Sequence, residues 1–227
     1  MNTLIITIDG PVASGKSTVA HLLAKKLGIK HLSSGLFYRS VAYIALQEHP
    51  SCNLHDEQLQ RYLEPEHFMY QWTDTGQAYI LYKHKNITPF LKTPAIDACA
   101  ARLAERSCVR DFILLMQHTL AQTYSLIAEG RDLGSVVFPE ATVKFFLTAE
   151  LTVRAQRWQE LQKNLGITLT VSQAIELISQ RDTRDRQRVL APLIIPKNAV
   201  IIDASDKSPE AVVEVMIRYV NEKRAKL

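Results

Sequence analysis

The chain has 227 residues, of which 47% are hydrophobic, enough for one full core in an α/β domain with inserted subdomains. Its 27 basic and 23 acidic residues give a net charge of only +4, too mild to indicate a nucleic-acid-binding protein. Because no stretch approaches the ~20 apolar residues of a membrane span, we expect a soluble protein with no membrane partner.

Three cysteines are present, Cys52, Cys99 and Cys108. Their number is odd and no C-x-x-C spacing occurs, so the sequence indicates neither a zinc site nor a disulfide framework. This pattern fits a reducing compartment, and we expect a cytoplasmic location.

The first predicted strand covers the apolar residues 4–8 and leads into a glycine-bounded loop, residues 10–18, and a helical pattern that runs to Leu27. The loop matches G-x-x-x-x-G-K-S/T in the strand–loop–helix context of a phosphate-binding P-loop, which disfavours a glycine turn that binds nothing. Lys16 would reach the terminal phosphates of a nucleoside triphosphate, and the Ser17 hydroxyl would bind magnesium. The predicted ATP-binding residues here are Gly10, Pro11, Val12, Ala13, Ser14, Gly15, Lys16, Ser17 and Thr18.

Strands and helices then alternate. Gly28 is a plausible end for the first helix, residues 29–32 read as a second strand, and residues 33–46 lead into a second helix. The other strand candidates are residues 126–128, 143–147 and 200–202, followed by a last helix that begins at Ser208 and Pro209. The sequence therefore predicts a five-stranded parallel sheet flanked by helices.

Two segments interrupt this alternation. Residues 67–87 alternate apolar and polar side chains around the turn 73–76, which predicts a β-hairpin insert. Residues 151–188 are helical and rich in arginine, with residues 164–166 connecting two helices. We expect this second segment to form a mobile arm that closes over bound phosphates.

The arm ends in a run of alternating arginines and aspartates, residues 181–188. Helical spacing places Arg181, Asp185 and Arg188 on one face, with Arg184 beside them. Such runs commonly form a solvated face of ion pairs. In a chain with a P-loop, however, arginines are also the groups that stabilise the charge of a transferring phosphoryl group.

Polar side chains are expected at the carboxyl edge of the sheet, where open α/β sheets bind ligands. Glu129 ends the third strand and is followed by Arg131 and Asp132. Glu129 would order magnesium, or alternatively cap a turn. Arg39 lies one helical turn past Gly35 and suits an acceptor phosphate, because guanidinium binds phosphate in a bidentate manner.

These pieces, in this order, resemble the bacterial cytidylate kinases, which belong to the nucleoside monophosphate kinase group. The resemblance rests on residues 6–18, 34–39, 109–110, 130–139, 181–186 and 191–193 and so covers nearly the whole chain. It implies Mg²⁺-dependent transfer of phosphate from ATP to CMP or dCMP by a single P-loop kinase domain, residues 1–227. Within that domain the core would be residues 1–62, 90–150 and 189–227, the β insert of the monophosphate-binding region 63–89, and the lid 151–188.

The resemblance also implies residue roles. Arg110 and Asp132 would face cytosine, and Asp185 would hold the ribose. The remaining CMP-binding positions would be Ser34, Gly35, Arg39, Arg131 and Arg188, the three arginines holding the acceptor phosphate. Lys16, Arg131, Arg184 and Arg188 would be catalytic, Ser17 and Glu129 would hold the metal, and Arg157 and Arg181 would bind ATP. The arm's candidates for the donor phosphates are Arg154, Arg157, Arg181 and Arg184.

The chain departs from the family pattern at three positions. Ser33 stands where the family usually has an acid, Lys92 where it has an arginine, and Ala101 where it often has a serine that contacts the base. The change at Ser33 removes a carboxylate near the metal, for which Glu129 could substitute. The change at Ala101 removes one contact to cytosine.

Two other functions remain open from the residues. One is a P-loop kinase of another nucleotide or small acceptor, although a carboxylate paired with an arginine at Asp132 and Arg110 suits cytosine better than a sugar. The other is a non-enzymatic ATP-binding module whose arm contacts RNA or protein. The alternation of arginines with aspartates disfavours RNA, so we expect nucleotide ligands and no nucleic acid partner. We also expect a monomer.

Overall fold

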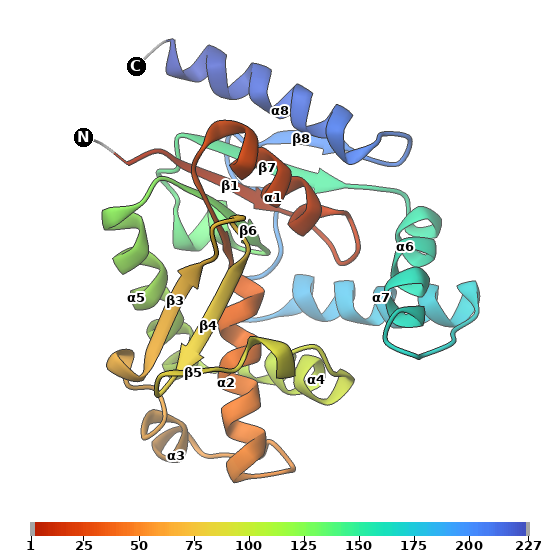
Figure 1. Ribbon diagram of the computed structural model, residues 1–227. Helices are drawn as coiled ribbons and strands as arrows, with labels where there is room; N and C mark the ends of the chain where they lie inside the picture. The colour runs from red at the N-terminus through yellow and green to blue at the C-terminus, as the bar shows by residue number, and fades with distance from the viewer. Residues whose placement is uncertain (1–2, 226–227) are drawn as a thin grey trace. The chain divides into compact units, whose positions relative to one another are not determined.

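The computed structural model describes residues 3–225 (Figure 1). Its strands are β1 (Ile5–Asp9), β2 (Lys30–Ser33), β3 (Phe68–Trp72), β4 (Ala78–Tyr82), β5 (Lys85–Asn86), β6 (Leu126–Gly130), β7 (Val143–Thr148) and β8 (Val200–Asp203). Its α-helices are α1 (Lys16–Leu27), α2 (Ser34–Glu48), α3 (Asp56–Gln60), α4 (Pro94–Leu103), α5 (Ser107–Thr123), α6 (Leu151–Lys163), α7 (Val171–Gln187) and α8 (Pro209–Arg224). Short helical turns are η1 (Pro65–His67), η2 (Thr88–Phe90) and η3 (Leu133–Val137).

The predicted five-stranded sheet is confirmed, with the strand order β2-β6-β1-β7-β8. β1 runs parallel to β7, with Ile8 opposite Phe145, and β7 runs parallel to β8. The predicted hairpin is confirmed as β3 and β4, which pair in antiparallel fashion around the turn 73–77. The short strand β5 extends it to three strands.

The chain divides into two compact units, one made mainly of Lys30–Leu126, the other of Leu4–Ile29 and the chain from Ile127 onward. In the second unit, α1 and α8 pack against each other on one face of β1, β7 and β8 (Figure 1). The alternate residues Ile6 and Ile8 of β1 and Phe145 and Leu147 of β7 all point to this face and are fully buried. Strands buried in this way appear in the sequence as apolar runs, which is why they were predictable.

The first unit is built around α2 and the hairpin. Alternation places Phe68 and Tyr70 in its interior, while Met69 between them is exposed. Tyr70 stacks on Phe37 of α2 with ring centroids 4.9 Å apart, and its hydroxyl accepts a hydrogen bond from the Ser33 N–H at 2.8 Å. The insert is therefore packed firmly on the end of β2 and the start of α2.

The predicted arm consists of α6 and α7, which lie side by side and are joined through the turn at Gly166 (Figure 1). α7 begins with a capping box in which the Thr170 hydroxyl accepts from the Gln173 N–H and the Gln173 side chain accepts from the Thr170 N–H. Within the part of the chain that the structure describes, no helix is long and apolar enough to cross a membrane.

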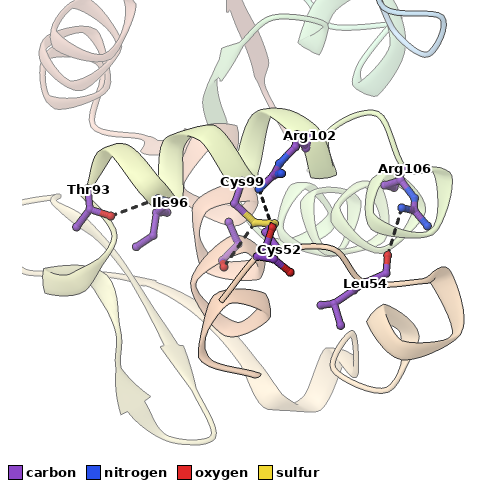
Figure 2. Close-up of a disulfide and its surroundings, with 9 residues drawn as sticks. Cys52, Leu54, Thr93, Ile96, Cys99, Arg102 and Arg106 are labelled. Atoms are coloured by element: carbon purple, nitrogen blue, oxygen red, sulfur yellow. Dashed lines mark hydrogen bonds between the residues drawn. A yellow bond between two sulfur atoms is a disulfide. The ribbon is translucent and has the colours of Figure 1, made fainter. Parts of the chain in front are cut away.

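The expectation of no disulfide is wrong for one pair of cysteines. Cys52, in the loop after α2, is bonded to Cys99 of α4, and Figure 2 shows the bond joining these two segments. Both residues are buried and their Cα atoms are 6.0 Å apart, whereas Cys108 is a free thiol. The 47 residues that separate the two in sequence hide their proximity, because only the packing of α4 on α2 brings them together.

The pairing predicts one reactive thiol, not three, when the chain is unfolded in denaturant without a reductant and titrated with a thiol reagent, because unfolding exposes Cys52 and Cys99 to the reagent unless they are bonded to each other. Reduction should lower the melting temperature. A cross-link across 47 residues lowers the entropy of the unfolded chain, and in a chain-entropy treatment this raises the free energy of the unfolded state by about 4 kcal/mol. A Cys108→Ser variant is the control, and reduction should affect its stability as it does the parent's. Three reactive thiols in the unreduced, denatured protein would contradict the bond.

Candidate active site

The P-loop connects β1 to α1 and depends on backbone conformations that few residues adopt. Gly10 has a φ of 153°, and a Cβ there would lie 2.0 Å from the Leu147 carbonyl oxygen of β7. Ala13 and Gly15 also have positive φ values, 57° and 95°. These positive φ values turn the loop back over the N-terminus of α1, where backbone N–H groups are available to an anion.

Lys16 lies inside this loop and is buried. Its Nζ donates to the Pro11 carbonyl oxygen at 2.6 Å and to the Ser14 hydroxyl at 3.2 Å. Burial, and next the nearby positive charge of Arg131, hold the pKa of Lys16 well below its ordinary value. The negative charge of an anionic ligand would raise this pKa and so oppose both effects, which favours a negatively charged group beside Lys16.

The two predicted metal-binding residues are in contact. The Ser17 hydroxyl at the start of α1 donates to a carboxylate oxygen of Glu129 at 3.1 Å, and Glu129 is 6% exposed at the end of β6. Magnesium prefers oxygen ligands and is commonly held by one or two protein groups together with substrate phosphates. A hydroxyl and a carboxylate next to a phosphate loop fit that ion.

Asp9 was not predicted as a site residue, but it fixes the loop that carries two of them. This fully buried carboxylate accepts from the backbone N–H groups of Leu133 at 2.8 Å and Gly134 at 2.7 Å. A Cβ at Gly134 would lie 2.7 Å from Thr7 Oγ1, so only glycine allows this approach. Asp9 thereby joins the end of β1 to the loop that follows Arg131 and Asp132.

Arg131, Asp185 and Arg188 lie close together. Arg131 Nε donates to Asp185 at 2.7 Å, and Arg188 lies 4.0 Å from the other Asp185 oxygen. Burial alone would raise the pKa of Asp185, but the charge and hydrogen bond of Arg131 outweigh it and hold that pKa below its ordinary value. The buried Arg188 Nε has no hydrogen-bond partner among the described residues, so this group retains a donor for a ligand.

The arginines of the arm differ in their surroundings. Arg184 is exposed on α7, Arg181 lies over the Trp158 ring at 5.8 Å, and Arg157 donates to the Ala204 carbonyl oxygen at 2.7 Å. Arg154 is instead buried in an ion pair with Asp182 at 2.5 Å. Its contacts do not support the expectation that it reaches the donor phosphates.

The other acceptor candidates belong to the unit around α2. Ser34 is buried at the first turn of α2, and a Cβ at Gly35 would lie 3.0 Å from the Arg39 guanidinium. Arg39 Nε donates to Asp97 of α4 at 2.8 Å, and Arg110 Nη1 donates to the Ala104 carbonyl oxygen at 3.3 Å. Asp97 was missed, because nothing in its local sequence shows that α4 packs beside Arg39.

The buried carboxylate of Asp9 predicts a specific pH dependence of stability. Burial raises its pKa from 3.8 to about 6, against the two backbone hydrogen bonds and the charge of Lys16, and with a contribution from Asp132. Because the folded-state pKa is the higher one, Asp9 stabilises the fold below about pH 4, and this contribution is lost as the pH rises through about 6. The shift corresponds to about 3 kcal/mol at most.

The comparison that isolates Asp9 is between the parent and an Asp9→Asn variant, unfolded by urea at pH 4, 5, 6 and 7. The free energy of unfolding of the parent, relative to that of the variant, should fall as the pH rises. An exposed substitution, Asp206→Asn, should show no such trend. A parent-to-Asp9→Asn difference that is constant with pH would refute the assignment.

Comparison with known proteins identifies the family. The sequence profile of the cytidylate kinases matches residues 6–222. The chain is 37% identical over 226 residues to the cytidylate kinase of Colwellia psychrerythraea, covering 98% of both chains, and 38% identical over 218 residues to that of Pseudomonas aeruginosa, covering 95% of this chain and 94% of the relative. An uncharacterised protein from Eubacterium ventriosum shares the fold at a TM-score of 0.56 and 12% identity, over 96% of this chain and 99% of its own. The chain belongs to the cytidylate kinase family.

Proposed function

We propose that this chain transfers the terminal phosphoryl group of ATP to CMP or dCMP, giving ADP and CDP or dCDP. The observation that carries the proposal is the family match over residues 6–222, because a P-loop alone does not specify an acceptor. The buried lysine and the contact between Ser17 and Glu129 support the donor half of the reaction.

At the donor end, the loop N–H groups and Lys16 would bind the β- and γ-phosphates of ATP. Phosphate oxygens would replace the Pro11 carbonyl and Ser14 hydroxyl that Lys16 contacts in the structure. Ser17 and Glu129 would hold Mg²⁺, which neutralises phosphate charge when bound. Arg157, Arg181 and Arg184 would approach the donor from the arm, with the exposed Arg184 the least constrained of the three.

At the acceptor end, the proposed roles divide by charge. Arg131 and Arg188, together with Arg39, would hold the CMP phosphate, and Asp185 would accept from the ribose hydroxyl groups. The charge of Arg131 acts on both Lys16 and Asp185, which suits a cation that stabilises the phosphoryl group during transfer. Ser34 and Gly35 would complete the phosphate end.

The base would be read by Asp132 and Arg110. A carboxylate accepts from the cytosine amino group, and a guanidinium donates to the ring nitrogen and carbonyl. Uracil presents a carbonyl to Asp132 where cytosine presents a donor. Ala101 stands in place of a serine and would remove one contact to the base. The preference for CMP over UMP should therefore be smaller.

We further propose that the chain acts in the cytoplasm, as a monomer, on nucleotides and not on nucleic acid. The charge pattern of residues 181–188 supports a nucleotide ligand, since alternating aspartates oppose binding to a phosphate backbone. In a cytoplasm buffered by thiols, Cys52 and Cys99 would be kept reduced. The bond between them would then form only after exposure to an oxidant.

A coupled assay for ADP release tests the reaction across CMP, dCMP, UMP and AMP. CMP and dCMP should support turnover with Mg²⁺ present, and UMP and AMP should be poorer acceptors. Lys16→Ala should lower kcat roughly 10²–10³-fold, since the lysine stabilises developing charge. Lys25→Ala, exposed on the same helix, is the matched control. Turnover near the parent level in a folded Lys16→Ala variant would contradict the donor assignment, and turnover confined to AMP would contradict the acceptor.

The base preference should depend on Asp132. Asp132→Ala should reduce the ratio of kcat/KM for CMP to that for UMP by about ten- to a hundredfold, mainly by weakening the use of CMP. This range follows from the roughly 1–3 kcal/mol cost of an unpaired buried polar group. Asp206→Ala, an exposed change of the same kind, should leave the ratio unaltered. If the ratio survives Asp132→Ala, another residue reads the base.

A further inference from the structure

One residue of the P-loop has both of its backbone polar groups bound by the same ion pair. The Val12 N–H donates to Asp182 Oδ1 at 3.0 Å, and the Val12 carbonyl oxygen accepts from Arg154 Nη1 at 3.1 Å. Arg154 and Asp182 are themselves joined at 2.5 Å, although they lie on different helices of the arm, α6 and α7. The amide of Val12 is therefore occupied and does not face a phosphate.

The pair is buried and anchored on more than one side. The side chains of Arg154 and Asp182 are 8% and 7% exposed. Arg154 Nε also donates to the Ala149 carbonyl oxygen, just before α6, at 3.0 Å. The Val12 side chain is buried in a small apolar cluster with Ala155, Ala174 and Ile178, against which Trp158 and Ile175 pack.

These contacts fix the peptide planes on both sides of Val12. The next residue, Ala13, has a positive φ, and the N–H groups that follow point to an anion only if the loop keeps this conformation. Helix packing alone does not account for Arg154 and Asp182, because a buried ion pair often adds less stability than apolar residues of the same size. Holding a polar backbone in one conformation is a task that apolar residues cannot perform.

We propose that Arg154 and Asp182 are positioning residues for the donor-phosphate loop, which they hold in its ATP-binding conformation through Val12. The inference rests on the proposed function only in naming ATP as the ligand of this loop. It also restricts the expected motion of the arm. The part of α6 and α7 around the pair is tied to the P-loop, so closure involves the distal turn at residues 164–166 or moves the loop as well.

The decisive variant removes the hydrogen bonds without leaving a buried charge. A double substitution, Arg154→Met with Asp182→Leu, replaces the pair by apolar side chains. The protein should still fold with a moderately lower melting temperature, because apolar packing offsets the lost ion pair while the N–H and carbonyl groups of Val12 lose their partners. Its dissociation constant for ATP with Mg²⁺, measured by titration calorimetry without acceptor, should rise roughly ten- to a hundredfold. The KM for CMP at saturating ATP should change less than about twofold, on the ground that the pair contacts the donor loop.

A milder variant and a matched control complete the design. Asp182→Asn keeps an acceptor for the Val12 N–H but removes the charge that holds Arg154, so its loss of ATP affinity should be smaller and in the same direction. Glu176→Gln is the same chemical change on an exposed position of α7 and should leave ATP affinity unaltered.

Two outcomes would overturn the proposal. The first is a folded double variant that binds ATP like the parent. The second is equal weakening of ATP and CMP, which would indicate a structural role alone. If the double variant does not fold, Asp182→Asn decides by the same criteria. Failure of the proposed function is distinguishable, since a parent that binds ATP but phosphorylates no CMP still allows the affinity comparison.

Discussion

Cations that are to receive phosphate must be held close together before any phosphate is present, and carboxylates make this possible. Arg131 is near enough for its charge to act on Lys16, and the burial of Lys16 removes water that would screen this charge. Asp185 pairs with Arg131, Glu129 contributes a further negative charge, and Asp182 pairs with Arg154. These carboxylates therefore offset the positive charges of Lys16, Arg131 and Arg154.

The carboxylates fall into two groups according to what they contact. Asp9 and Asp182 accept from backbone N–H groups, at residues 133–134 and at Val12, and such contacts can persist when a nucleotide binds. Asp185 and Asp97 instead pair with the side chains of Arg131 and Arg39, which are proposed to bind phosphate. These pairs would have to rearrange as the ligand enters. The first group sets the shape of the loops, and the second lowers the cost of keeping arginines in place without a ligand.

The sequence was sufficient to predict the five strands of the main sheet, the hairpin and the residues that follow fixed motifs. Apolar runs identified the five strands, and alternation around residues 73–76 identified the hairpin, because both patterns are local. The partnership of Ser17 and Glu129 could be anticipated, since both were expected at the carboxyl edge of one sheet. Asp97, the Cys52–Cys99 bond and the role of Asp182 could not, because each depends on which helices pack together. Asp9 had a local signal, a carboxylate ending a buried strand directly before the P-loop, but its partner lies 124 positions away.

The arm and the P-loop share one small apolar core, so each stabilises the other. α6 and α7 bury only a few apolar side chains between them, chiefly Ala155, Ala174 and Ile178, and Val12 of the P-loop completes that cluster. The P-loop thus contributes an apolar side chain to the core of the two helices. In turn, Arg154 and Asp182 of these helices hold the backbone of the loop through hydrogen bonds. Linkage between two such elements is reciprocal. If the arm strengthens ATP binding by some free energy, bound ATP stabilises the arm by the same free energy. The arginines carried by α7 would then become better ordered when the donor is bound.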